Sequence, residues 1–212
     1  MRRGHSSFVG LFASDKSEHA IAFESIYELE YLYLLETDAD VVAVRSQPET
    51  LHWDDDGIRR RHVPDFCVFR TDRIELVEVK PDAIDDEAEA SDEEELLQRR
   101  TEILKTQLAK EGRIYTLVRE TEIRREPRLG NAKILMNGLG QAPSPALRAD
   151  VLAMMANGPA PIADLVAAVG KGPHFVNAVY ALVLAGDLEL VDPDAPLTWQ
   201  SAIQRRRATQ WG

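Results

Sequence analysis

Hydrophobic and polar positions change their spacing several times along the first half of the chain. Continuous or alternating apolar runs predict strands, and apolar residues three or four apart predict helices. Residues 24–36 are rich in Leu, Glu and Tyr and contain no Gly or Pro, which predicts a helix. A second helix is predicted over 93–111, with Gly112 at its C-terminal cap. Strands are predicted at 41–45, 63–69, 74–80 and 114–118.

The pattern changes after a stretch rich in Gly, Pro and Ser at residues 136–146, which is typical of a linker or turn. Three further helices are predicted, at 145–156, 161–169 and 173–185. A Gly-Asp turn and a short strand with the sequence LELVD follow them. Three short helices with a terminal β element match the plan of a winged-helix domain. A generic helical bundle used for contacts is the alternative.

The order of these elements indicates the fold class. Helix, strands, helix and strand in the first part predict an α/β fold with a small mixed sheet flanked by helices. The predicted domains are 1–136, a linker at 137–145, and a winged-helix-like C-terminal domain at 146–212.

Composition limits the setting in which the protein works. The chain of 212 residues has a single cysteine, Cys67, which excludes an internal disulfide framework and a multi-cysteine zinc cage. No apolar run reaches the roughly 18–20 residues needed to span a bilayer, and the start lacks the apolar region of a signal peptide. We therefore expect an intracellular, cytoplasmic protein that does not engage a membrane.

A net charge of −11, taken alone, argues against a nucleic-acid partner, which is itself negatively charged. However, residues 82–95 hold nine acids and no base, and without them the net charge is −2. Basic clusters occur elsewhere, including Arg59-Arg60-Arg61-His62 and Arg99-Arg100. Because the acidity is mostly local, a partner that carries phosphates remains compatible with the sequence.

Three charged residues stand at the ends of the apolar runs predicted to be strands. Glu78 follows Asp65 by thirteen positions, and Lys80 shares a strand face with Glu78 because side chains alternate along a strand. If the two runs pair as a hairpin, these side chains meet beside the core. Buried charge without a partner is costly, so such a cluster needs a metal, mutual pairing or substrate.

A third carboxylate is predicted from the helix over 24–36. Glu28 shares a helix face with several mostly apolar neighbours, so we expect it to point partly inward. Glu30 and Glu36 fall elsewhere on the helical wheel and are expected to be solvated.

Carboxylates gathered in one cleft bind a hard cation such as Mg²⁺ through oxygen. The bound cation polarises a phosphoryl oxygen and activates water, and a nearby lysine stabilises charge on the phosphate. This combination suits phosphodiester hydrolysis. The alternative is a hairpin that carries an ordinary surface Glu–Lys pair.

Several motifs occur in an order that resembles a known family. A helical Glu followed by Pro-Asp and Glu-x-Lys is the pattern of the PD-(D/E)xK nuclease superfamily. Over about residues 8–135 the chain resembles the TnsA family of transposon-end endonucleases. The segments that carry the resemblance are Phe23-Glu24-Ser25 with Glu28, Leu34-Leu35-Glu36, Val41 to Gln47-Pro48, His62 to Phe66, Glu78 to Pro81, and Gly112 with Ile114-Tyr115.

The resemblance implies roles for individual residues and a restriction-endonuclease-like fold. Glu28, Asp65 and Glu78 match the acidic site positions of the family, and Lys80 matches its lysine. Mg²⁺ is the implied cofactor, and Mn²⁺ is expected to substitute for it. Members of the family vary between Glu and Gln at the position of Glu78, so Asp65 is the stronger metal ligand.

Three more positions take part in the matching motifs. The main-chain carbonyl of Val79 is a candidate metal ligand. Gln47 matches a common glutamine and is expected either to support the site or position DNA, or to cap a loop. Glu24 is expected to be a helix-start acid favoured by the helix dipole.

The resemblance also implies a function and partners. The expected activity is cleavage of double-stranded DNA at the 5′ ends of a transposon. A separate transposase of the TnsB type and an ATP-dependent regulator of the TnsC type are the expected protein partners. A stand-alone repair or restriction nuclease, and a non-catalytic DNA-binding scaffold, are the alternatives.

Overall fold

A computed structural model of the chain describes residues 8–82, 88–141, 143–169 and 174–206. It contains two compact units. The first comprises Met1–Leu35 and Asp40–Arg124, and the second comprises Glu36–Ala39 and Arg125–Gly212.

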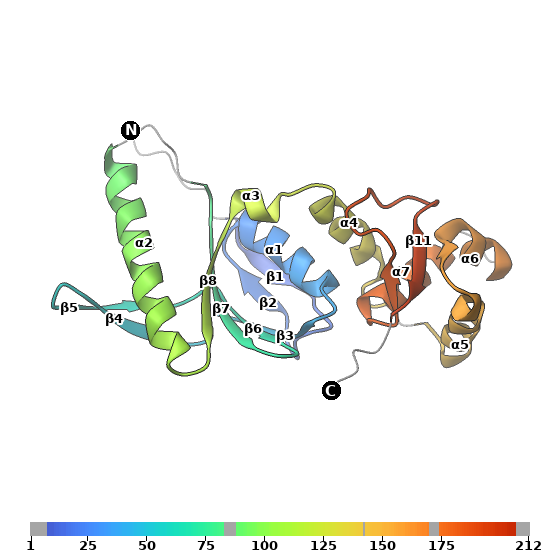
Figure 1. Cartoon of the computed structure of the whole chain (residues 1–212), viewed down its shortest axis with the longest axis horizontal. Helices are drawn as coiled ribbons and strands as arrows, with labels where there is room; N and C mark the ends of the chain where they lie inside the picture. Colours follow the sequence, from blue (N-terminus) through green and yellow to red (C-terminus); the bar gives the residue numbers. More distant parts are fainter. Residues whose placement is uncertain (1–7, 83–87, 142, 170–173, 207–212) are drawn as a thin grey trace. The chain divides into compact units, whose positions relative to one another are not determined.

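A four-stranded sheet forms the centre of the first unit (Figure 1). Its strands lie in the order β3, β6, β7, β8, and β3–β6 and β6–β7 are antiparallel whereas β7–β8 is parallel. The predicted mixed sheet flanked by helices is therefore confirmed. The strands span Val41–Ser46, Phe66–Arg70, Ile74–Lys80 and Ile114–Arg119.

Two helices bury the two faces of this sheet. Helix α1 (Ile26–Thr37) packs the ring of Tyr31 against Phe66 of β6, with 6.2 Å between the ring centroids. Helix α2 (Ala88–Ala109) covers the other face. That face carries one hydrophobic cluster, whose buried members are Leu51, Trp53, Cys67, Leu76, Leu104, Leu108 and Tyr115.

Two hairpins and a short helix of the first unit were not predicted. One hairpin joins β1 (Gly10–Phe12) to β2 (Ile21–Phe23), and the other joins β4 (Leu51–Asp55) to β5 (Ile58–His62). Asp56 and Gly57 form the β4–β5 turn, both with positive φ, as a tight two-residue hairpin turn requires. The short helix α3 spans Glu120–Ile123.

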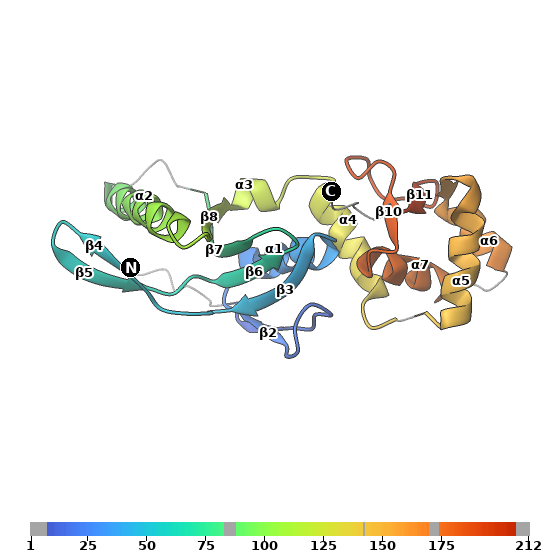
Figure 2. The same ribbon diagram turned by 60° about the horizontal axis from the view of Figure 1, so that its bottom comes forward.

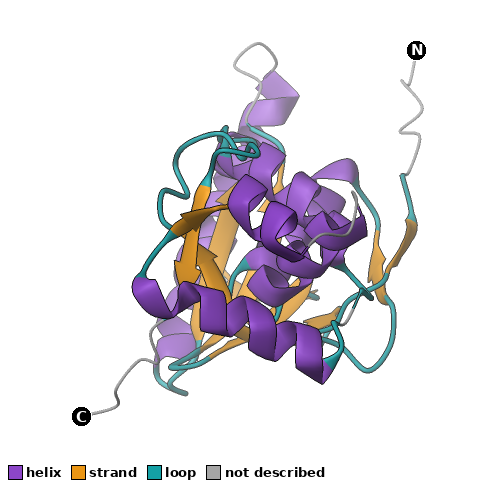
Figure 3. Cartoon of the chain, turned by 90° about the vertical axis from the view of Figure 1, so that its right-hand side faces the viewer, coloured by secondary structure: helices purple, strands orange, loops and turns teal. Residues whose placement is uncertain are grey.

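Helices make up most of the second unit and are purple in Figure 3. The helices are α4 (Arg128–Leu135), η1 (Met136–Gly138), α5 (Pro145–Met154), η2 (Met155–Asn157), α6 (Ile162–Val169) and α7 (His174–Leu184). The strands β9 (Ala160–Pro161), β10 (Leu188–Leu190) and β11 (Ala202–Arg205) form an antiparallel sheet in the order β10, β11, β9. The three helices predicted after residue 144 correspond to α5, α6 and α7. The winged-helix assignment stays a prediction.

The division between the two units falls at Arg124, before helix α4. Leu135 at the end of α4 is buried in the core of the second unit, together with Val179 and Leu182 of α7. The side chain of Asn131 donates hydrogen bonds to the carbonyls of Pro193 and Ala195. These contacts place α4 with the second unit. The domain boundary expected from the sequence, at residue 136, lies after this helix and stays a prediction.

Two expectations about the acids of α1 were wrong. Glu30 and Glu36, expected to be solvated, are only 6% and 2% exposed. Glu30 is buried because Arg124 supplies its counter-charge, with 2.7 Å between Arg124 Nε and Glu30 Oε2.

No helix in the described part of the chain is long and apolar enough to cross a membrane.

Candidate active site

Asp65 and Glu78 lie at corresponding positions of the antiparallel pair β6–β7. The register pairs Phe66 with Val77, and continuing it by one residue sets Asp65 opposite Glu78. Asp65 Oδ2 accepts a hydrogen bond of 2.7 Å from the main-chain N–H of Val79. Strand pairing therefore brings together the two carboxylates that the sequence predicted to meet.

Glu78 is the most heavily paired carboxylate of the site and is only 2% exposed. Its Oε1 lies 2.8 Å from Lys80 Nζ and 3.0 Å from a guanidinium nitrogen of Arg100 on α2. Its Oε2 lies 3.0 Å from His62 Nε2 at the end of β5. That same nitrogen of His62 is 3.0 Å from the hydroxyl of Tyr115 on β8. The sheet, the β4–β5 hairpin and α2 all contribute to this cluster.

The pKa of Asp65 is raised from its ordinary value to about 7. Burial is the main cause, followed by repulsion from Glu78 and a smaller repulsion from Glu28. The hydrogen bond from Val79 and the positive charge of Lys80 lower the pKa but do not offset these effects. A carboxyl in this state is poised to lose its proton when a further cation approaches.

The pKa of Glu78 is lowered, although burial alone would raise it. The His62 ring and the Lys80 ammonium stabilise the charged form and outweigh the cost of burial. One oxygen is nevertheless poorly satisfied, because Glu78 Oε2 accepts no well-aligned hydrogen bond from any described residue. The site thus holds a buried, ionised carboxylate, one oxygen of which lies 3.0 Å from the His62 ring without a well-aligned hydrogen bond.

Glu28 forms the N-terminal cap of α1. Its Oε2 accepts a 2.8 Å hydrogen bond from the main-chain N–H of Glu24, and its Oε1 accepts a 2.9 Å hydrogen bond from the Ser25 hydroxyl. In return, the Ser25 hydroxyl accepts a hydrogen bond from the main-chain N–H of Glu28. This is a variant of the capping box, in which the carboxylate accepts from the N–H of Glu24 instead of that of Ser25. The predicted inward carboxylate therefore stabilises the start of α1 and also lies close enough to Asp65 to raise its pKa.

Gln47 connects the start of α1 to the strand that carries Asp65. Its side-chain amide donates a 2.7 Å hydrogen bond to Glu24, and its main-chain N–H donates a 2.9 Å hydrogen bond to the carbonyl of Asp65. Gln47 also has a left-handed backbone, with φ of 43°. Gln47 is therefore placed so that it could support the segment that carries Asp65. Glu24, expected only as an acid at the helix start, also accepts the hydrogen bond from the Gln47 amide.

Sequence reasoning gave no roles to His62, Arg100 or Tyr115. All three come from elements that lie far from β7 in the sequence and meet Glu78 only through tertiary packing. His62 and Tyr115 belong to segments that carry the family resemblance, and Arg100 belongs to a basic cluster. These were available signals, but sequence alone does not show which charged side chains of α2 face the sheet.

No group of three His, Cys, Asp or Glu side chains in the described ranges is gathered so as to hold one metal ion. Within the acidic run 82–95, residues 83–87 lie outside the described residues. Near its ends, Asp82 accepts a 3.1 Å hydrogen bond from the Thr121 hydroxyl, and Glu94 is ion-paired with Arg119.

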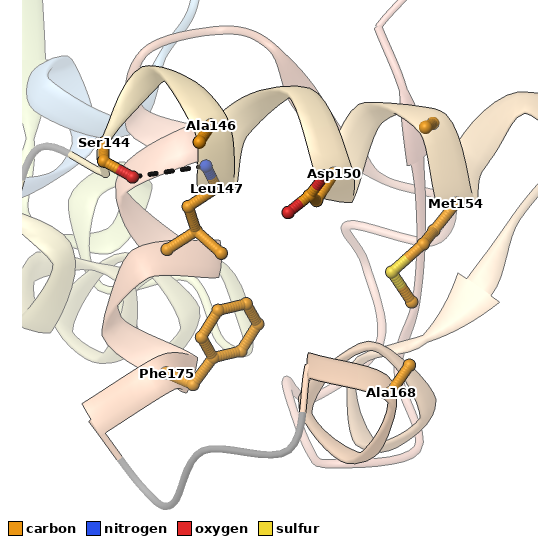
Figure 4. Close-up of a pocket in the computed structure, with 8 residues that line it drawn as sticks. Ser144, Ala146, Leu147, Asp150, Met154, Ala168 and Phe175 are labelled. Atoms are coloured by element: carbon orange, nitrogen blue, oxygen red, sulfur yellow. Dashed lines mark hydrogen bonds between the residues drawn. The ribbon is translucent and has the colours of Figure 1, made fainter.

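A pocket of about 640 Å³ lies in the second unit, between α5, α6 and the start of α7 (Figure 4). Asp150 points into it from α5 and is its one charged lining residue among those described. The other lining residues are Ser144, Ala146, Leu147, Ala153, Met154, Ala168 and Phe175. Because it lacks a cluster of ionisable groups, this pocket is not the candidate active site.

Comparison with known proteins indicates what the chain is similar to. A search of curated proteins finds no match to the chain. Residues 38–120 match the family model described as the TnsA-like endonuclease N terminal. The matched stretch contains Gln47, His62, Asp65, Glu78 and Lys80, whereas Glu28 precedes it. Over this range the chain is similar to a transposition-related nuclease of the TnsA-like type.

Proposed function

We propose that the protein is a metal-dependent DNA endonuclease that cuts at the 5′ ends of a transposon. It works beside a separate transposase of the TnsB type and an ATP-dependent regulator of the TnsC type. The observation that carries this proposal is the pairing of Asp65 with Glu78 across β6–β7, with Lys80 on the same strand face as Glu78. The match to the TnsA-like family model supports the transposition setting.

The donor groups of the site fit a cation that prefers oxygen ligands. Asp65 has a raised pKa because it is buried near Glu78, so a cation between them would relieve their repulsion. Glu78 Oε2 is a buried acceptor without a well-aligned hydrogen bond from the described residues. Asp65, Glu78 and the main-chain carbonyl of Val79 are the proposed ligands of Mg²⁺ or Mn²⁺, and Glu28 is a further acid close to Asp65. When bound, the cation supplies Lewis-acid polarisation of the phosphate and activates water.

Lys80 and Arg100 have complementary tasks in this proposal. Both lie within 3.0 Å of Glu78 Oε1, so they hold this carboxylate in its ionised form. Lys80 is 39% exposed, whereas the side chain of Arg100 is 20% exposed. Lys80 is therefore the cation that is able to turn towards a phosphate, and Arg100 keeps Glu78 in position.

Metal binding is tested first by thermal unfolding of the full chain with and without Mg²⁺ or Mn²⁺. A metal present at a hundred times its dissociation constant should stabilise the fold by about 2.7 kcal/mol. Asp65→Ala should abolish this gain. Asp72→Ala is the matched control, because Asp72 lies in the turn of the same hairpin and its side chain is 56% exposed. An equal gain in Asp65→Ala would exclude Asp65 as a ligand.

Catalysis is tested separately, by cleavage of transposon-end DNA in the presence of the transposase and regulator. We expect Asp65→Ala and Lys80→Ala to remove cleavage while Asp72→Ala retains it. Cleavage by pure, folded Asp65→Ala would contradict the assignment. Strong cutting of plain plasmid DNA by the protein alone would instead indicate a stand-alone repair or restriction nuclease.

One observation favours a second candidate function, a non-catalytic DNA-binding scaffold. Glu78 already has three cationic or ring partners, and both oxygens of Glu28 accept hydrogen bonds from the start of α1. A site satisfied in this way needs no metal for its stability. Absence of a metal effect on unfolding, both with and without DNA, would support the scaffold.

A further inference from the structure

The β4–β5 hairpin has two faces of different chemistry. Cross-strand partners share a face, and the register pairs His52 with Arg61 and Asp54 with Arg59. Leu51, Trp53 and Asp55 alternate with His52 and Asp54 along β4 and are buried, whereas His52 and Asp54 are exposed. The hairpin therefore has an inner face that packs on the protein and an outer face that carries Arg59 and Arg61.

The inner face anchors the hairpin firmly to α2. Leu51 and Trp53 belong to the cluster that contains Leu104 and Leu108 of α2. Arg60 stacks over Trp53, with 5.8 Å from its guanidinium carbon to the ring centroid, and its Nε lies 2.7 Å from Asp55. Figures 1 and 2 show the hairpin beside α2 and extending beyond the end of the four-stranded sheet.

The two outer arginines form no ion pair within the described structure. Arg59 and Arg61 are exposed, and no described residue forms an ion pair or hydrogen bond with either. Asp54 stands opposite Arg59, but its Oδ1 accepts the 2.7 Å hydrogen bond from Gly57 that closes the turn. Arg60, the residue between them, contacts Trp53 and Asp55 on the inner face. Two guanidinium groups are thus presented to solvent from a rigid support in a chain whose net charge is −11.

The position of these arginines relates them to the candidate active site. Residues two apart on a strand are about 6.8 Å apart, which is close to the spacing of neighbouring phosphates along a DNA strand. Arg61 directly precedes His62, which contacts Glu78, and Asp65 follows three residues later. Arg59 and Arg61 therefore lie on the strand that leads into the site, and their side chains leave it on the face opposite to that of His62. They would contact the duplex where it extends beyond the site rather than within it. Guanidinium groups also bind phosphate through two parallel hydrogen bonds, which suits them to this contact.

We propose that Arg59 and Arg61 bind backbone phosphates of the DNA duplex next to the bond that is cut. This inference rests on the proposed function, because it takes DNA as the substrate. The contacts are to phosphates and do not read base sequence, so they position the duplex along the hairpin. Arg60 serves the fold instead, although it lies between them.

The test is equilibrium binding of a fluorescent duplex of random sequence by the full chain, without divalent metal, over a series of salt concentrations. The double variant Arg59→Gln/Arg61→Gln is compared with the native chain. The matched control, Lys105→Gln/Lys110→Gln, removes the same charge from exposed positions at and just beyond the end of α2. All four substituted residues are exposed, so thermal unfolding should show that each variant remains folded.

Each phosphate contact contributes about 0.9 to the slope of log affinity against log salt, so loss of two should reduce the slope by about 1.8. If the contacts act through counterion release alone, the dissociation constant rises about sixty-fold at 0.1 M salt. The control should leave the slope unchanged.

An unchanged slope in the arginine variant, or an equal fall in the lysine control, would overturn this inference but leave the nuclease proposal intact. The nuclease proposal has its own test, the cleavage activity of Asp65→Ala. Failure of the native chain to bind duplex even at the lowest salt would overturn this inference, and the nuclease proposal would then be decided by the cleavage test with the transposase and regulator. Loss of slope together with full cleavage by Asp65→Ala would keep the DNA contact and reject the assigned catalytic residue.

Discussion

The carboxylate of Asp65 accepts a 2.7 Å hydrogen bond from the main-chain N–H of Val79, the residue between Glu78 and Lys80. One strand thus holds Asp65 in place through its backbone and presents a carboxylate and an ammonium through its side chains. The pairing of β6 with β7, continued by one residue to Asp65 and Glu78, sets the relative positions of Asp65, Glu78 and Lys80. Changes to these side chains should therefore alter charge and chemistry without dismantling the sheet.

The first prediction concerns the pH dependence of stability. Because the pKa of Asp65 is raised to about 7 in the folded state, the folded chain binds more protons than the unfolded chain between about pH 4 and pH 7. The free energy of unfolding should therefore fall as the pH rises through this window. The pKa of Glu78 is lowered, so its ionised form stabilises the folded state. This stabilisation is fully present above the ordinary pKa of a glutamate and is lost only as the pH falls below that value.

Urea unfolding at pH 5 and pH 8 measures this effect. In Asp65→Asn the contribution of this residue should disappear, so that the variant gains stability relative to the native chain as the pH rises. Asp72→Asn, in the exposed turn, should follow the native chain at both pH values. A constant difference between Asp65→Asn and the native chain across this range would disprove the raised pKa.

The second prediction concerns Arg100, which brings a positive charge from α2 to the buried Glu78. Arg100→Ala should lower the free energy of unfolding by about 1–3 kcal/mol, because a buried carboxylate loses a charged hydrogen-bond partner. Lys105→Ala on the same helix is the control. The side chains of Lys105 and its partner Glu102 are both largely exposed, so their ion pair should be worth less than about 1 kcal/mol. Chemical unfolding of the two variants in parallel, repeated with Glu78→Gln, shows whether the cost depends on the Glu78 charge.

The third prediction separates the two tasks of Glu28. Ser25→Ala removes the hydroxyl partner in the capping box and should destabilise the fold by roughly 1 kcal/mol without changing the metal response. Glu28→Gln keeps one side-chain oxygen, which can accept one of the two hydrogen bonds of the cap, and it removes the negative charge near Asp65. Its main effect should therefore be on metal-dependent stabilisation and on the pKa of Asp65. If Ser25→Ala weakens the metal response as strongly as Glu28→Gln, the role of Glu28 is structural alone.

The fourth prediction tests the packing of the second unit with two nearby glycines. A Cβ atom at Gly138 would lie 2.4 Å from the main-chain nitrogen of Ala181 in α7, which cannot move without disturbing the helix. Gly138→Ala should cost about 1–3 kcal/mol or more. At Gly140 a Cβ meets nothing within 4 Å, but φ is +68°, so Gly140→Ala should cost roughly 1–2 kcal/mol through backbone strain alone. Calorimetric unfolding should show the larger loss for Gly138→Ala, and the reverse order would contradict the close packing of η1 on α7.

Local patterns in the sequence predicted most of the central sheet. The strands β3, β7 and β8 coincide closely with predicted apolar runs, because β-branched residues bounded by turn residues leave little choice of structure. Asp65 and Glu78 were also brought together correctly, since the antiparallel pairing of two consecutive strands follows from the short turn between them. These are properties of segments that interact with their immediate neighbours.

Two missed features had clear local signals. Asp56-Gly57 between alternating residues is a strong signal for a hairpin, and it marks the β4–β5 turn. Ser25 and Glu28 form the S-x-x-E signature of a capping box, which explains the position of Glu28 better than helical periodicity does. The charged residues in 51–62 were treated only as a basic cluster, although they alternate between the buried and the exposed face of the β4–β5 hairpin.

The remaining misses depended on tertiary contacts. Glu30 is buried because Arg124, far away in the sequence, neutralises it. Arg100 reaches Glu78 only because Leu104 and Leu108 fix the rotation of α2 against the sheet. Such contacts are decided by the packing of whole elements, and no local pattern in the sequence contains them.

The Asp56-Gly57 turn has a consequence for how the protein could change over time. The two-residue turn sets the register of β4 against β5, and because side chains alternate along a strand, a slip of one residue in this register would exchange the two faces of β5. Arg60 would then face solvent, while Arg59 and Arg61 would be directed towards Trp53 and the surface of α2. A slip by a single position would therefore damage the hydrophobic core and the surface that carries Arg59 and Arg61 at the same time. A change that slips this register should be tolerated far less than substitution of the exposed arginines themselves.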